Sequence, residues 1–247
     1  GIMIKPVVSA NYSANNYVMK GVEVPNEDNT RFVTGDFERF HDDYFSLYGE
    51  LEIGVANKKW ADAFFVGGSF SKMDKELQTG SVQTKVYGMA ERHTLSKGVS
   101  AVYNKRNFLV EDLAFSASAS YSWDHSRTIA RSEITGRARS LRHYKRPMAV
   151  VRTNFDYRLS DKHSLNLNYM FNRTGNEQYD DVDDTYEPSK DAVSKHIVGF
   201  SYNQLLADGK MENVLFVKDY INHVEIGQTE LGSITGANTV ERSTTKN

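Results

Sequence analysis

The stretch that decides the fold is Leu113–Trp123, which reads Leu-Ala-Phe-Ser-Ala-Ser-Ala-Ser-Tyr-Ser-Trp. Its odd-numbered positions hold leucine, phenylalanine, alanine, tyrosine and tryptophan, whereas serine or Ala114 occupies every position between them. A period of two residues is that of a β-strand, because successive side chains of a strand point to opposite faces. The stretch therefore predicts a strand with one oily face and one small, mostly polar face.

The same alternation recurs in three other runs of the chain. Their apolar sides are formed by Phe45, Leu47, Gly49, Leu51, Ile53 and Val55, by Val151, Thr153, Phe155 and Tyr157, and by Leu165, Leu167, Tyr169 and Phe171. Charged residues such as Glu50, Glu52 and Arg152 fall on the other side of these runs. Repeated alternation between turn signals predicts an all-β, antiparallel fold.

Two kinds of connection join the runs. Short turns rich in Asn, Asp or Gly are predicted at 57–59, 107–111, 160–163 and 207–210, and long polar loops at 71–97, 125–147, 173–194 and from 223 onward. Hairpins would then begin near residues 45, 98, 148 and 195, with another formed by Met3–Ala10 and Tyr17–Val24. Strict alternation of short and long connections over about ten strands is typical of transmembrane β-barrels.

Strand length and aromatic placement favour the same reading. About ten residues separate the short turn from Trp123, which matches a tilted strand that crosses a membrane. Aromatic residues lie near both ends of the runs, as in the interfacial girdles of such barrels. They are Trp60, Phe155 and Tyr157 near short turns, and Tyr121, Trp123, Tyr169 and Phe171 near long loops. The alternative is that these rings pack a soluble β core.

Composition excludes several classes of protein. The 247 residues carry a net charge of −2, so no overall field draws the chain to nucleic acid. The absence of cysteine rules out disulfides, thiolate metal sites and cysteine nucleophiles. No apolar run is long enough for a transmembrane helix. Because Gly1-Ile2-Met3-Ile4 enters alternating sequence directly, we expect any export signal to lie upstream or to have been removed.

Several segments resemble a known family. Residues 98–113 (Gly-Val-Ser-Ala-Val-Tyr-Asn-Lys-Arg-Asn-Phe-Leu-Val-Glu-Asp-Leu), 139–145, 154–165 and Phe171-Asn172-Arg173 are similar to periplasmic hairpins in the barrels of TonB-dependent receptors, particularly those of Bacteroidetes. The likeness spans about residues 98–222. It implies a 22-stranded barrel with an N-terminal plug, a contact with TonB, and uptake of an iron chelate, a cobalamin or a glycan across the bacterial outer membrane.

The chain departs from that family in three ways. It has strands for less than half of such a barrel, it shows no plug or TonB box, and residues 242–247 lack the terminal aromatic strand. We therefore expect residues 1–247 to be one interior segment of the barrel. Expected partners are outer-membrane lipid and lipopolysaccharide, TonB through a plug absent from this chain, a small-molecule or glycan ligand, and a surface lipoprotein. No nucleic acid and no cofactor are expected.

Candidate binding residues lie in the basic segment 127–146. Arginine and lysine match carboxylate and phosphate groups, so Arg137, Arg139, Arg142, Lys145 and Arg146 are predicted to contact an anionic ligand or the phosphates of lipopolysaccharide. The alternative is a solvated loop. The next long segment, 177–191, is acidic but lacks the EF-hand pattern, and we expect it to pair with the basic one.

No catalytic or metal-binding pattern is present. The seven histidines are dispersed, and no nucleophile elbow or phosphate loop occurs, so we expect no catalysis. Three functions remain open: a nutrient receptor, a complete small outer-membrane barrel that serves as an adhesin or anchor, and a soluble β-barrel whose oily face points inward onto a hydrophobic ligand. Closure of the sheet and the direction of the oily face distinguish them.

Overall fold

In the computed structural model, the described residues form strands and no helix. The structure describes residues 1–26, 28, 30–79, 86–131, 137–206, 210–228 and 239–246. The strands are β1 (Ile2–Ser13), β2 (Val18–Pro25), β3 (Phe32–Glu38), β4 (Tyr44–Ala56), β5 (Ala63–Thr79), β6 (Val86–Lys105), β7 (Leu113–Arg131), β8 (Ala138–Ser160), β9 (His163–Asp180), β10 (Ser189–Leu206), β11 (Met211–Gln228) and β12 (Thr239–Lys246). Among the described residues there is no helix with the length and apolar character needed to span a membrane.

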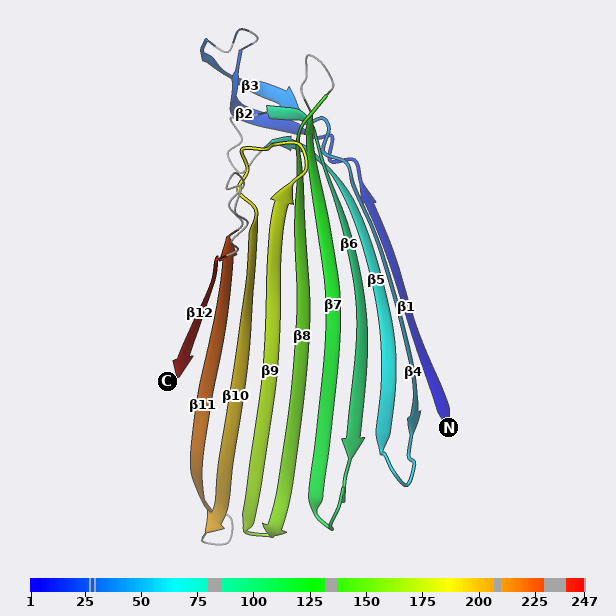
Figure 1. Cartoon of the computed structure of the whole chain (residues 1–247). Coiled ribbons are helices and arrows are strands. Elements are labelled where there is room, and N and C mark those ends of the chain that lie inside the picture. The colour runs from blue at the N-terminus through cyan, green and yellow to red at the C-terminus, as the bar shows by residue number, and fades with distance from the viewer. Residues whose placement is uncertain are drawn as a thin grey trace.

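Ten of the strands form one antiparallel sheet, in the order β1-β4-β5-β6-β7-β8-β9-β10-β11-β12. The predicted all-β, antiparallel class is confirmed. The sheet is open, however: β1 and β12 lie at opposite sides of it, and no pairing joins these two edge strands in the described part of the chain (Figure 1). The chain therefore forms an arc and not a closed barrel.

The short turns lie together at one end of the sheet, as predicted (Figure 1). Asn57 and Asn107 adopt positive φ angles of 56° and 52°, and Asp112 one of 60°. Asparagine and aspartate tolerate this left-handed region better than other non-glycine residues. The Asn107 carboxamide oxygen also accepts the Asp112 backbone N–H at 2.9 Å, which closes the β6–β7 turn. Residues 207–209 of the fourth turn lie outside the described residues.

The long connections are much shorter than predicted, because the strands continue into them. β5 reaches Thr79 and β6 starts at Val86, β7 reaches Arg131, and β8 starts at Ala138. Pairing persists through positions with polar or charged residues, for example Thr128 opposite Arg142. Polar side chains indicate contact with water, but they do not prevent backbone pairing. The prediction of loops at 71–97, 125–147 and 173–194 is therefore wrong, because these segments consist mainly of paired strand residues at the end of the sheet away from the short turns.

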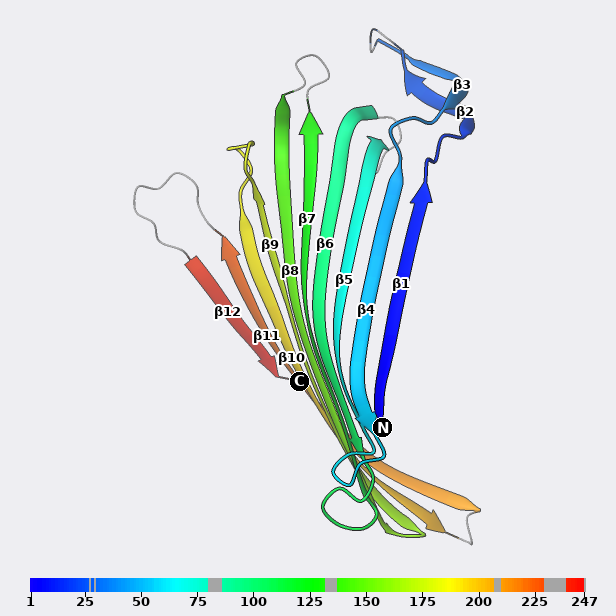
Figure 2. The same ribbon diagram turned by 90° about the vertical axis from the view of Figure 1, so that its right-hand side faces the viewer.

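The predicted N-terminal hairpin is also wrong. The strands exist, but β1 pairs with β4 and β2 pairs with β3, so β2 and β3 form a separate flap inserted between β1 and β4 (Figure 2). His41 has a left-handed φ of 49° where the chain returns from the flap. Next to it the buried carboxylate of Asp42 binds Arg39 at 2.6 Å and Lys75 of β5 at 2.7 Å. These ion pairs fasten the base of the flap to the main sheet.

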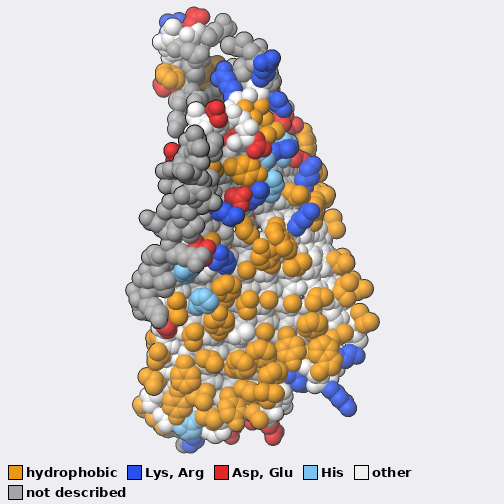
Figure 3. Space-filling model, in the orientation of Figure 1, with side chains coloured by type: hydrophobic (Ala, Val, Ile, Leu, Met, Phe, Trp, Pro, Cys, Tyr) orange, Lys and Arg blue, Asp and Glu red, His pale blue; other side chains and the backbone are white. Residues whose placement is uncertain are grey.

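Register places the four oily runs on one face. Side chains directly opposite each other in paired strands share a face. One continuous row across β4 to β9 is Ile53, Val66, Ala101, Ala119, Val151 and Phe171. Figure 3 shows this face, with apolar side chains gathered over the half nearer the short turns. No described element covers it, and Val66 is 47% exposed.

We expect Asn107→Val to destabilise the sheet and Asn107→Gly to be tolerated. A β-branched residue at a φ of 52° costs about 1–3 kcal/mol, whereas glycine adopts this angle freely. Thermal unfolding of the detergent-purified protein, followed by circular dichroism, measures the difference. Equal midpoints for the two variants would show that the turn conformation does not contribute to stability.

Candidate functional site

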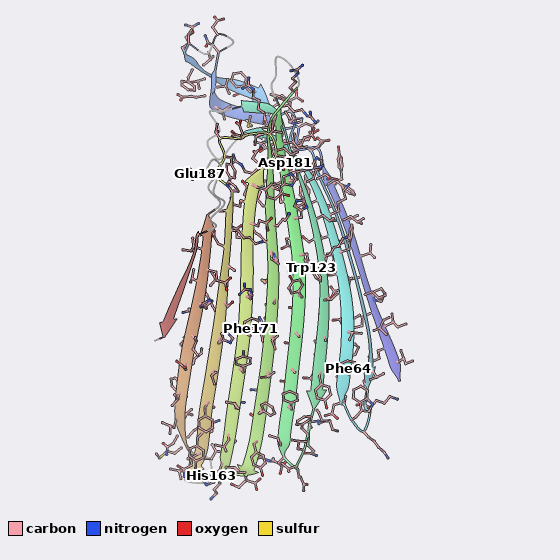
Figure 4. The ribbon with its side chains drawn as sticks, in the orientation of Figure 1. Phe64, Trp123, His163, Phe171, Asp181 and Glu187 are labelled. Carbon is pink, nitrogen blue, oxygen red and sulfur yellow. The ribbon has the colours of Figure 1, made fainter. Side chains whose placement is uncertain are left out.

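The two ends of the sheet differ chemically. Figure 4 places His163 at the short-turn end and Asp181 and Glu187 at the opposite end, with Phe64, Phe171 and Trp123 between these levels. On the face seen in Figure 3, charged and histidine side chains gather towards the end that carries Asp181. We refer to this region, formed by the ends of β5–β10 away from the short turns, as the charged end.

The five predicted binding residues do not form one cluster. Arg137 directly precedes β8, and the other four lie within β8, so none of these four is in a loop. Side chains alternate along a strand, so neighbouring residues of β8 lie on different faces. Lys145 and the residue opposite it, His125, lie on the oily face, whereas Arg142 and Arg146 lie on the polar face. Arg137 and Arg139 are exposed. The interpretation of segment 127–146 as a loop is wrong for the residues that β7 and β8 contain, whereas contact of these residues with an anionic ligand stays a prediction.

Lys145 is held by β9. Its ammonium lies 3.2 Å from Glu177 and 4.7 Å from the centre of the Tyr179 ring. Contact with Tyr179 and then with Glu177 raises the pKa of Lys145. Burial tends to raise the pKa of Glu177, but hydrogen bonds and attraction from Lys145 and Lys190 outweigh it and lower this pKa. The expected pairing of the basic and acidic segments is therefore confirmed here.

Arg142 is a half-buried side chain with two partners. Its guanidinium lies 4.2 Å from the ring centre of Tyr186 and 3.9 Å from the Asp180 carboxylate. Cation–π contact together with an ion pair holds this side chain in place. Arg142 thus ties the β9–β10 connection to β8.

Asp180 is the most strongly held carboxylate of the charged end. It accepts hydrogen bonds from the Ser140 hydroxyl and from the backbone N–H groups of Leu141, Val182 and Asp183, each of the last three at 2.9 Å. Burial tends to raise the pKa of Asp180, but these hydrogen bonds outweigh burial and lower it to about 2. This carboxylate organises the tip of the β9–β10 hairpin and is a structural group.

Arg146 lines a hollow on the polar face. The hollow has a volume of about 450 Å³ and is lined by Met73, Arg92, Thr94, Ser96, Asp124, Ser126, Tyr144 and Arg146. Arg92, which donates to Thr128 at 3.2 Å, was not predicted because it lies outside the basic segment 127–146 and only the strand register brings it near Arg146. Two arginines against one carboxylate favour a polar ligand with negative charge.

The sequence also did not predict that His125 and His143 are neighbours. His125 Nε2 and His143 Nδ1 lie 2.9 Å apart, and His143 stacks on Tyr179 with ring centres separated by 4.6 Å. Burial and the nearby positive charges of His143, Lys145 and Arg127 lower the pKa of His125. The residues lie 18 positions apart on different strands, so only the strand register brings them together. Within the described ranges no group of three or more His, Asp or Glu residues could hold a metal ion.

No protein-family model, no curated protein and no solved structure matches this chain. The sheet provides an uncovered oily face, a polar face with a cationic hollow, and a charged end in which most of the predicted basic residues have structural partners.

We expect Asp180→Asn to loosen the β9–β10 tip at neutral pH. Because the folded pKa lies below the usual value of 3.8, the carboxylate stabilises the tip fully above 3.8 and loses this effect as the pH falls through about 2. The shift corresponds to about 2 kcal/mol. Amide hydrogen exchange at Leu141, Val182 and Asp183 should be faster in the variant at pH 7, and the rate difference from wild type should shrink as the pH falls through 3.8 and vanish below about 2. The exposed Asp184→Asn is the control; equal exchange in both variants would contradict the assignment.

Proposed function

We propose that this chain forms part of the wall of an outer-membrane nutrient receptor of the TonB-dependent type. The observation that carries the proposal is the direction of the two faces. The oily face is left uncovered by the described strands, whereas the lining of two hollows includes serine, asparagine and arginine of the polar face. A soluble barrel for a hydrophobic ligand requires the reverse arrangement.

The dimensions of the oily band support a membrane location. From β4 to β8, the rows between Phe64 and Tyr121 hold no charged side chain on the oily face. On the same face of β6, Lys105 opposite Phe115 and Lys97 opposite Trp123 lie in the rows just beyond these. The two lysines are eight residues apart, which at ~3.3 Å per residue and a tilt of about 40° spans roughly 20 Å, close to the ~25 Å apolar band of outer-membrane barrels. Lysine side chains at such margins extend their ammonium groups towards water. Beyond this band the same face becomes charged (Figure 3).

Aromatic rings lie at both margins of the band. Near the short turns, Phe115 stacks on Phe155 with ring centres 4.5 Å apart, and Trp60 contacts Phe64 at 5.6 Å. At the other margin Tyr121 and Trp123 contact each other at 4.2 Å, and Trp123 is 50% exposed. Rings at both interfaces are what a membrane girdle requires.

In this proposal the barrel wall makes and breaks no bond. A ligand enters at the charged end, contacts the polar face, and passes when a plug driven by TonB is displaced; the plug, the TonB contact and the ligand classes follow from the family resemblance. The short turns then lie on the periplasmic side, and the charged end faces the exterior, where lipopolysaccharide and a surface lipoprotein are the expected neighbours.

The membrane location can be tested with a pair of adjacent residues. Ala119 and Ser120 are both exposed but lie on the oily and polar faces, and the chain contains no cysteine that would compete for a label. A nitroxide label on Ala119→Cys should collide mainly with oxygen, which concentrates in lipid, and a label on Ser120→Cys mainly with a water-soluble nickel chelate. The protein is labelled in outer-membrane vesicles. The reversed pattern would support the soluble barrel with an inward oily face.

Nutrient uptake requires a separate test. Deletion of the gene should abolish growth when one nutrient from a panel of iron chelates, cobalamin and glycans is limiting, and deletion of TonB should give the same defect. Growth that is unaffected on every nutrient, together with loss of surface attachment, would instead support the adhesin.

A further inference from the structure

We propose that a second hollow on the polar face binds an acidic, hydroxyl-rich ligand such as an oligomer of sugar acids. This lower groove has a volume of about 680 Å³ and extends over β6–β11, nearer the short turns than the hollow at Arg146. A volume in the range of roughly 300–1,000 Å³ suits a small molecule. The inference rests on the proposed function in so far as the polar face is the side that a ligand passes.

The charge of the lower groove selects for an anion. Arg152 and Lys218 line it, and no aspartate or glutamate does. Arg152 forms no ion pair within the part of the chain that the structure describes, and Lys218 contacts only the Tyr220 ring, at 5.0 Å. Both cations therefore retain donors for a ligand. Lys195 adds a third positive charge on the same face, one row nearer the charged end.

The spacing of the cations suits an extended ligand with more than one acidic group. Arg152 lies on β8 and Lys218 on β11, three strands away. At ~4.8 Å between neighbouring strands, their backbones are about 14 Å apart. Cations that stand on strands this far apart can contact separate acidic groups, so the geometry favours an extended oligomer whose acidic groups are distributed along its length.

Between the two cations the groove offers partners for hydroxyl groups. Ser116, Ser118 and Ser201 provide hydroxyls, and Asn154 and Asn168 provide amides. The two amides form a hydrogen bond to each other at 2.5 Å, which fixes their orientation. Groups that both donate and accept are suited to sugar hydroxyls, which do the same.

An exposed ring completes the groove at its β11 side. Phe216 lines the groove and is 71% exposed, and Tyr220, on the same face of β11, is 40% exposed. On a polar face, rings that are this exposed leave apolar area uncovered that a flat partner can bury. The combination of a ring, amides, hydroxyls and separated cations matches a sugar-acid oligomer better than a compact anion or a neutral glycan.

The test uses the full-length protein purified from outer membranes in detergent, with a galacturonate tetramer as the probe and a neutral maltose-type tetramer as its uncharged counterpart. Titration calorimetry should show binding of the acidic tetramer only, and added salt should weaken it. Arg152→Gln and Lys218→Gln should each lower the affinity about tenfold or more, because a charge-assisted hydrogen bond is lost. Lys58→Gln, which removes an equal charge from a short turn, should leave the affinity unchanged.

Three results would overturn the proposal: equal binding of both tetramers, unchanged affinity in the Arg152 and Lys218 variants, or failure of a water-soluble maleimide to react with Ser118→Cys, since another polypeptide segment would then fill the groove. Far-UV circular dichroism confirms that each variant keeps its sheet. Because binding in detergent needs neither TonB nor a membrane, this experiment can fail while the label and growth experiments succeed, and the reverse also holds.

Discussion

The structure depends on one constraint, the register of antiparallel pairing. A shift of one residue between two strands would exchange the faces of every side chain in one of them. The row from Ile53 to Phe171 shows that this register is kept across six strands. The short turns fix it, because Asn57 and Asn107 adopt the backbone angle that a tight connection needs. The separation of oily and polar faces, and both hollows, follow from that register.

The sequence correctly predicted the features that depend on a single strand or a single turn. Alternation in Leu113–Trp123 identified both faces of β7 correctly, and the turn residues located the hairpins that begin with β4, β6, β8 and β10. Both signals are local: a side chain's face depends on its own position, and a turn depends on a few residues with unusual φ preferences. Such properties do not require knowledge of which strand lies alongside.

The wrong predictions concern which strands pair with each other and where each strand ends, and both are properties of the whole sheet. Nothing in Met3–Ala10 indicates that this segment pairs with β4 across an inserted flap. Likewise, hydrophilic segments were interpreted as loops, although the strands stay paired between the oily band and the charged end. The assignment of the basic residues to a loop was wrong for the same reason: in a loop Lys145 and Arg146 could lie side by side, but a strand directs them to opposite faces.

The two edge strands, β1 and β12, place a further requirement on the proposed membrane location. Within a bilayer, an unpaired backbone group has no water to bond and costs several kcal/mol, so lipid-exposed sheet edges do not occur. β1 and β12 each have only one neighbour in the described sheet. If the oily face lies in lipid, both edges must pair with further strands, and the polar face of the arc then becomes one part of an enclosed lumen. The uncovered oily face and the unpaired edges thus lead to the same requirement: the arc is stable in a membrane only as part of a closed wall.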